Sequence, residues 1–177
     1  MITSIWMVLT ILAKWLPHTA NYSPEIAMTV YLASRYRFLT ASLLTLLTVE
    51  IADIGLAVFY HYPAFGWWSL FNAISLLSIV AFFARPWLRG HFLDKISRVL
   101  GAALLYWLVT NFGVCLSAGY YPFTFSGFIL CYQMALPFLP AQLVSGVSFA
   151  VLWVVLEWRL KATAIANRSA PKYGSLP

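Results

Sequence analysis

Residues 38–85 read FLTASLLTLLTVEIADIGLAVFYHYPAFGWWSLFNAISLLSIVAFFAR, and this stretch decides the fold class. It contains two apolar runs, 38–60 and 67–85, joined by the segment HYPAFGW (61–67), which has no Lys, Arg, Asp or Glu. A run of about 20 mainly apolar residues is long enough to cross the hydrocarbon core of a bilayer as a helix. The stretch therefore predicts two transmembrane helices joined by a short loop.

The rest of the chain has the same character. Of its 177 residues, 62% are hydrophobic and only 9% are charged, with a mean hydropathy of +0.82. These values lie outside the range of soluble globular domains. They predict an all-α integral membrane protein, a single domain over residues 1–158 that forms a bundle of six transmembrane helices. The expected spans are 2–17, 24–35, 38–60, 67–85, 98–118 and 127–158.

The last span is long and contains Pro137 and Pro140. Proline removes a backbone donor and interrupts a helix, so we expect a kink or a short helical piece before the final helix. Beyond it, residues 159–177 are polar and basic, which predicts a disordered tail.

Apart from Lys14, the basic residues form three clusters at the ends of spans on one side of the predicted bundle. The positive-inside rule places such clusters in the cytoplasm, so both termini are expected to be cytoplasmic and the protein to cross the membrane several times. The basic residues form no aromatic-interleaved surface, so nucleic acid is not an expected partner. The three clusters are Arg35 and Arg37; Arg85, Arg89, Lys95 and Arg98; and Arg159, Lys161, Arg168 and Lys172.

The opposite ends of the spans are joined by three loops without charged residues, 18–24, 61–67 and 120–127. Their aromatic residues could be the ordinary belt found at membrane interfaces. Three loops of like composition on one face favour a further interpretation, a lid over a site for an apolar or flat ligand.

Polar side chains inside the spans form a band beneath these loops. At a rise of about 1.5 Å per residue, Asp53 and Asn111 lie roughly 12–13 Å below the loops, and Asn72 and Gln133 about 8–9 Å below. Glu50 precedes Asp53 by three residues and shares its helix face, which would favour a proton shared by the two carboxylates. The band predicts a polar pocket, because an intramembrane carboxylate is rarely kept without a partner, a proton or a ligand.

An alternative is that these polar groups only hydrogen-bond to one another and hold the helices together. The pocket interpretation assigns a ligand-binding role to the band and to several residues of the loops and their flanks. The predicted ligand-binding residues are Asp53, Asn111, Asn72, Gln133, Glu50, Asn21, Tyr22, Trp67, Tyr121 and Tyr132.

Cys115 and Cys131 flank the third loop and would lie at similar depth in an antiparallel hairpin. The favoured interpretation is a pair of small buried apolar residues, with a disulfide or soft-metal ligation together with His18 or His61 left open. No CxxC, HExxH, GxSxG or P-loop motif occurs. We therefore predict no bound metal, no cofactor and no catalytic residues.

Residues 85–100, RPWLRGHFLDKISRVL, alternate basic and apolar side chains. Such a segment is typical of a short interfacial helix that binds anionic membrane lipid, and it could also be a docking surface for a partner on the cytoplasmic side.

Three segments resemble a family of small bacterial membrane proteins of unknown function. They are WLPHTANYSPEIAMTVYLAS (15–34), EIADIGLAVFYH (50–61) and VTNFGVCLSAGYYPFTFSGFILCYQMALPF (109–138). That family in turn is similar to the substrate-binding (S) components of energy-coupling-factor vitamin transporters. The resemblance covers about residues 10–155.

The resemblance implies a six-helix, multi-pass protein of a bacterial cytoplasmic (inner) membrane that binds a small, vitamin-like nutrient under its outer loops. It also implies, as a partner, a transmembrane coupling subunit with ATPases encoded elsewhere. Two positions depart from the family pattern, since Cys115 stands where Trp is usual and the region of Ser145 and Gly146 lacks an expected Asp. A scaffold or assembly factor that does not transport is the alternative function.

Overall fold

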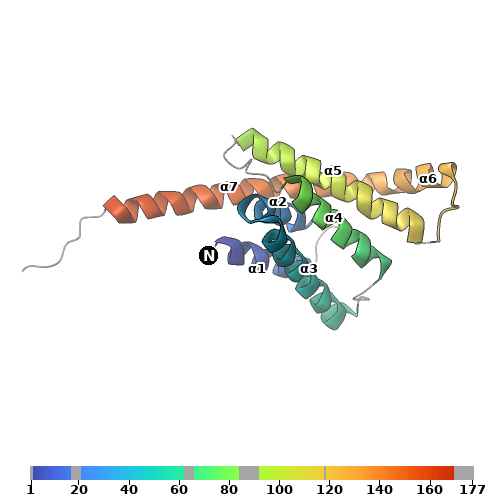
Figure 1. Cartoon of the computed structure of the whole chain (residues 1–177), viewed down its shortest axis with the longest axis horizontal. Helices are drawn as coiled ribbons and strands as arrows, with labels where there is room; N and C mark the ends of the chain where they lie inside the picture. Colours follow the sequence, from blue (N-terminus) through green and yellow to red (C-terminus); the bar gives the residue numbers. More distant parts are fainter. Residues whose placement is uncertain (1, 17–20, 62–65, 84–91, 118, 170–177) are drawn as a thin grey trace, which may run out of the picture.

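The computed structural model describes residues 2–16, 21–61, 66–83, 92–117 and 119–169, and every regular element in these ranges is helical. The helices are arranged as an elongated bundle from which the end of the last helix projects (Figure 1). Their bounds are α1 (Ile2–Trp15), α2 (Glu25–Arg35), α3 (Phe38–Tyr60), α4 (Trp67–Phe83), α5 (Phe92–Ser117), α6 (Phe125–Ala135), the short 3-10 helix η2 (Leu136–Phe138) and α7 (Leu139–Ser169).

Three stretches of helix are long and apolar enough to cross a membrane, namely Phe38–Tyr60, Phe92–Ser117 and Phe125–Leu160. The apolar helices α1 and α4 are shorter. Large apolar side chains are exposed along the outside of the bundle, including Leu39, Val58 and Phe82. An exterior of this kind fits contact with lipid, and the length and composition of the three stretches identify a membrane protein.

The predicted helix positions agree closely with those of α1 to α4. The last span is interrupted as the prolines predict, because the helix passes through η2 between α6 and α7. Two boundaries differ from the prediction. Helix α5 starts at Phe92, before the predicted residue 98, and α7 continues to Ser169, so the expected disorder does not begin at residue 159. The expected interfacial segment 85–100 lies partly in α5, and its first residues lie outside the described ranges, as do 170–177.

Helix α2 is the centre of the bundle and contacts α1, α3, α4, α5 and α7. All of its side chains from Glu25 to Ala33 are buried. Small residues, Ala27, Thr29 and Ala33, let neighbouring helices approach it, as is common where membrane helices pack. A helix that is buried on all sides gains no contact with lipid and acts as the core of the bundle.

The short length of α2 leaves space at one end of the molecule. Its 11 residues extend about 16 Å, whereas the 23 residues of α3 extend about 34 Å. The two helices are antiparallel and joined only by residues 36 and 37, so they are level at that end. Because α2 begins at Glu25, α3 extends further than α2 toward the other end of the molecule. The space beyond the first turn of α2 is bordered by neighbouring helices.

Helices α4 and α5 pack closely at Gly113. A Cβ atom placed there would overlap the Cβ and ring of Phe71 in α4, whereas a Cβ at Gly101 of the same helix would lie 3.6 Å from the Phe83 ring, an ordinary contact. We expect Gly113→Ala to lower the free energy of unfolding by about 1–3 kcal/mol through overpacking. Gly101→Ala is the matched control and should be neutral or stabilising. Thermal unfolding in detergent measures both, and equal melting temperatures for the two variants would contradict this packing.

Candidate ligand-binding site

A cluster of three charged residues lies above the first turn of α2. The Lys14 Nζ atom of α1 is 3.1 Å from Glu25 Oε2 of α2 and 3.0 Å from Asp53 Oδ1 of α3. The Lys14 and Glu25 side chains are only 13% and 5% exposed. Ionised groups removed from water need partners, and here one ammonium group lies between two carboxylates.

Polar side chains of α4, α5 and α7 continue this site. The Tyr106 hydroxyl donates a hydrogen bond to Asn72 Oδ1 at 2.7 Å, which joins α5 to α4. Gln142 of α7 donates from Nε2 to the Ala103 carbonyl at 2.6 Å. Asn111 donates from Nδ2 to the Trp107 carbonyl of its own helix at 2.7 Å. Each of these three side chains is thus held in place by a bond to a neighbouring group.

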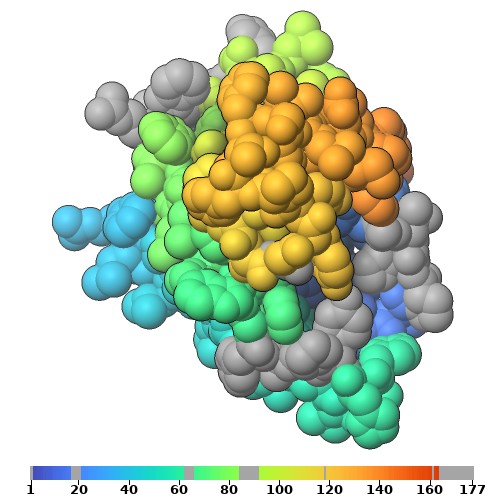
Figure 2. Space-filling view, turned by 90° about the vertical axis from the view of Figure 1, so that its right-hand side faces the viewer, coloured from blue at the N-terminus to red at the C-terminus, as the bar shows by residue number. Residues whose placement is uncertain are grey.

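The charged and polar groups surround a hollow of about 440 Å³, and an adjoining hollow of about 170 Å³ reaches Ser23, Glu25 and Ile26. The larger volume is within the range of about 300–1,000 Å³ found for small-molecule sites. Figure 2 shows the end of the molecule at which α6 (orange) lies above α4 (green) and the last turns of α3 (teal). The larger hollow is lined by Lys14, Asn21, Asp53, Leu56, Trp68, Asn72, Tyr106, Thr110, Asn111, Val114 and Gln142.

The structure brings together four of the residues predicted from the sequence. Asp53, Asn72 and Asn111 line the hollow, and so does Asn21, which has a left-handed backbone with φ of 62°. Asp53 and Asn111 come from the ends of α3 and α5, and Asn72 from the start of α4. The three side chains thus border one hollow, while their depth in a membrane stays a prediction.

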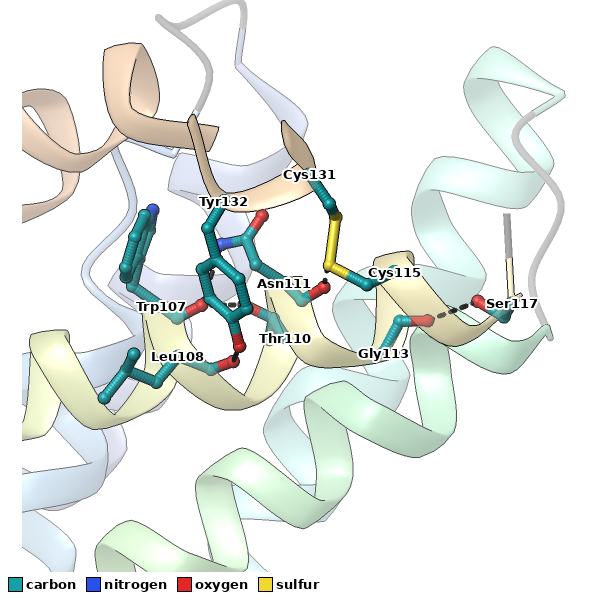
Figure 3. The surroundings of a disulfide bond; sticks show 9 residues. All are labelled: Trp107, Leu108, Thr110, Asn111, Gly113, Cys115, Ser117, Cys131 and Tyr132. Atoms are coloured by element: carbon teal, nitrogen blue, oxygen red, sulfur yellow. Dashed lines mark hydrogen bonds between the residues drawn. A yellow bond between two sulfur atoms is a disulfide. The ribbon is translucent and has the colours of Figure 1, made fainter. Parts of the chain in front are cut away.

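Gln133 and Tyr132 do not belong to this group, because α6 turns both away from the hollow. They line a shallow apolar groove on the outside of α6, and Gln133 is exposed. The Tyr132 hydroxyl donates to the Leu108 carbonyl at 2.8 Å (Figure 3). The expectation that Gln133 points into the bundle is wrong, since depth along a helix does not fix the direction in which a side chain points.

Four other predicted residues also lie away from the residues that line the hollow. Glu50 is half-buried on α3, and the partner of Asp53 is Lys14 rather than this carboxylate. The Tyr22 ring packs against the Phe149 ring, Trp67 is 65% exposed, and Tyr121 is half-buried. The lid predicted over the site depends partly on residues 18–20 and 62–65, which lie outside the described ranges.

Sequence reasoning missed several residues of the site. Lys14 could have been found, because a single cation inside an apolar helix is a functional signal in a membrane protein. Glu25 gave the same signal less clearly, since it follows Pro24 at the start of a short apolar run. Gln142 gave the same signal as Gln133, a polar amide within the last predicted span, but nothing in the pattern around Tyr106 and Thr110 distinguishes them from residues that face lipid.

Cys115 and Cys131 form a disulfide between α5 and α6 (Figure 3). Their Cα atoms are 5.8 Å apart. The favoured prediction, two unlinked apolar residues, is wrong, and the disulfide alternative is the one observed. Among the described residues, no three His, Cys, Asp or Glu side chains are grouped as metal ligands. The disulfide lies at the same end of α5 as Asn111 and Val114 and so close to the hollow.

A second charged cluster marks the opposite end of the bundle. Glu157 of α7 is 3.4 Å from Arg35 of α2 and 3.5 Å from Lys95 of α5. The Lys95 ammonium also lies 5.4 Å from the centre of the Trp153 ring. These contacts connect three helices, and they show that the basic residues of α2 and α5 lie at one end, away from the hollow.

The comparison with protein families identifies the class of the chain. A family model described as a family of unknown function (DUF6580) matches residues 1–166, and the chain belongs to this family. Searches of curated proteins and of solved structures gave no significant match.

Proposed function

We propose that this protein is a membrane component that binds a small, vitamin-like nutrient for uptake, similar to an S component of an energy-coupling-factor transporter. The observation that carries the proposal is the hollow of about 440 Å³. It contains polar or charged side chains from α1, α3, α4, α5 and α7, although most of the bundle is apolar. A few placed polar groups within a mainly apolar protein are typical of a site that orients a small ligand.

In the proposed arrangement the chain crosses the inner membrane six times, with both termini in the cytoplasm and the hollow facing outward. The basic residues Arg35 and Lys95 lie at the end that the positive-inside rule assigns to the cytoplasm. The disulfide supports the same orientation independently, since disulfides persist in oxidising compartments such as the periplasm. Helix α2, with 11 residues, is too short to cross about 30 Å of hydrocarbon alone, so in this arrangement the second crossing needs residues outside α2.

This orientation predicts which positions are accessible from outside the cell. Tyr120 is 84% exposed near the disulfide, and Arg37 is exposed at the basic end. In a background with the native cysteines replaced by Ser, Tyr120→Cys should react with a membrane-impermeant maleimide in intact cells. Arg37→Cys should react only after the cells are opened. Labelling of Arg37→Cys in intact cells would reverse the orientation.

Uptake requires an energy source, and the sequence contains no P-loop that could bind ATP. The resemblance to S components favours a transmembrane coupling subunit with separately encoded ATPases as the partner. The apolar exterior of the bundle would contact membrane lipid and leave room for such a subunit. The role we assign to this chain is binding rather than catalysis.

Two polar residues provide a test of binding at the site. Asp53→Ala and Asn111→Ala should each weaken retention of the natural ligand by about 5- to 150-fold, because loss of one orienting polar group costs about 1–3 kcal/mol. The full-length protein is purified in detergent, and small molecules extracted from it are quantified by mass spectrometry. Gln133→Ala, on the outside of α6, is the control. Equal amounts of the same compound in all three variants would favour a scaffold whose polar residues only connect helices.

A further inference from the structure

Among the described residues, the charged groups at the hollow do not balance. Lys14 contributes one positive charge, and Glu25 and Asp53 contribute one negative charge each, so the formal sum is −1. The two carboxylates share this one ammonium group, at 3.1 Å from Glu25 Oε2 and 3.0 Å from Asp53 Oδ1. An uncompensated negative charge in a poorly solvated site is unfavourable unless a further cation or several hydrogen-bond donors approach it.

One carboxylate oxygen shows where that partner would bind. Glu25 Oε2 accepts the ion pair with Lys14, but Glu25 Oε1 is buried and has no hydrogen-bond partner in the described part of the chain. The Glu25 side chain is only 5% exposed and borders the adjoining hollow of about 170 Å³. A buried charged acceptor without a donor is rare in native proteins and marks a position for a missing partner.

The neighbouring polar groups offer acceptors as well as donors. Gln142 and Asn111 each use one of their two amide N–H groups for a backbone carbonyl, so each keeps its amide oxygen and one N–H. The Tyr106 hydroxyl donates its proton to Asn72 Oδ1 and can still accept a hydrogen bond. Because two carboxylates share one ammonium group and Glu25 Oε1 has no donor in the described part of the chain, the charges favour a ligand with N–H donors.

We propose that the ligand is a small organic cation, a protonated amine whose N–H groups donate to Glu25 Oε1. This inference rests on the proposed binding function and adds the chemical class of the ligand. The rings of Trp68 and Tyr106 line the same hollows and suit an apolar or aromatic body attached to the cationic nitrogen. An anionic ligand is disfavoured, since it would approach two carboxylates that share a single ammonium group.

Three probes of nearly equal shape test the charge preference. Benzylammonium, benzyl alcohol and benzoate each carry one ring and differ in their polar group. The test is thermal-shift titration of the full-length protein in detergent at pH 7. Benzylammonium should stabilise the protein at a concentration at least about 10-fold lower than the concentration of benzyl alcohol that gives the same shift. Benzoate should not stabilise the protein.

Variants connect this preference to the carboxylates. Glu25→Gln keeps the shape of the side chain but removes its charge, so the advantage of benzylammonium over benzyl alcohol should be lost. Asp53→Asn should also reduce the advantage of benzylammonium over benzyl alcohol. It replaces Glu25→Gln in the test if that variant does not fold. Glu50→Gln is the matched control, because it removes one carboxylate from α3 without changing a residue that lines either hollow. The control should retain the preference of the unmodified protein.

Equal stabilisation by all three probes, stronger stabilisation by benzoate, or no response to benzylammonium would overturn the inference. Native mass spectrometry of the same preparation separates this failure from failure of the proposed function. A bound neutral or anionic small molecule would refute the cationic ligand and leave the binding function intact. Absence of any bound molecule, together with no response to the probes, would contradict both.

Discussion

Replacing Lys14 with Met is expected to destabilise the protein more than any other single change in the site. The substitution keeps the length of the side chain but leaves Glu25 and Asp53 without their shared cation. Removing one partner of a buried ion pair costs about 3–5 kcal/mol, because the remaining charge is neither solvated nor paired. We therefore expect a large fall in melting temperature in detergent and reduced accumulation in the membrane.

Two further variants show whether the loss comes from the stranded carboxylates. Lys14→Met combined with Asp53→Asn should recover part of the stability, since one of the two charges is then removed. Lys95→Met is the control at the opposite end, where Glu157 keeps its contact with Arg35, whose side chain is 50% exposed. A loss for Lys14→Met no greater than that for Lys95→Met would contradict the charged cluster as described.

Filling the hollow should have the largest effect on binding. Thr110 lines the hollow from α5, and its hydroxyl donates to carbonyls of its own helix. Thr110→Trp would place an indole ring where the ligand is expected to lie. We expect binding of the natural ligand to weaken by more than about 100-fold, or about 2.7 kcal/mol, while the protein still inserts and folds.

The same substitution on the exterior of α5 is the control. Leu104 is 43% exposed, so an indole there would lie against lipid or detergent. Leu104→Trp should therefore retain the ligand, as determined by mass spectrometry of the extracted protein. Retention of the ligand by Thr110→Trp, with normal folding, would place the binding site elsewhere on the molecule.

Helix positions were predictable from the sequence because an apolar helix in a bilayer has a length set by the membrane. The agreement over 38–60 and the interruption at Pro137 and Pro140 follow from hydropathy and from the missing proline donor. The extension of α7 to Ser169 was not predictable in this way, because polar composition alone does not exclude helix.

The direction of side chains was less predictable than their depth. Asp53, Asn72 and Asn111 face the hollow, but Gln133 at a similar predicted depth lies on the outside of α6. Helix α6 has 11 residues and contacts protein on one side and lipid on the other, and both environments are apolar. Its sequence therefore shows no contrast between a hydrophobic and a polar face that would indicate which side points inward. The contact between Lys14, Glu25 and Asp53 depends on which helices are neighbours, and spacing along the chain does not give that information.

Native mass spectrometry of the gently purified full-length protein tests the central claim most directly. The account predicts that one small molecule remains bound to the unmodified chain and to Leu104→Trp and is absent from Thr110→Trp. The molecule should be released by collisional activation as an intact compound of small-molecule mass. A chain without any bound compound, or one that keeps the same compound after Thr110→Trp, would contradict a ligand site in the hollow above α2.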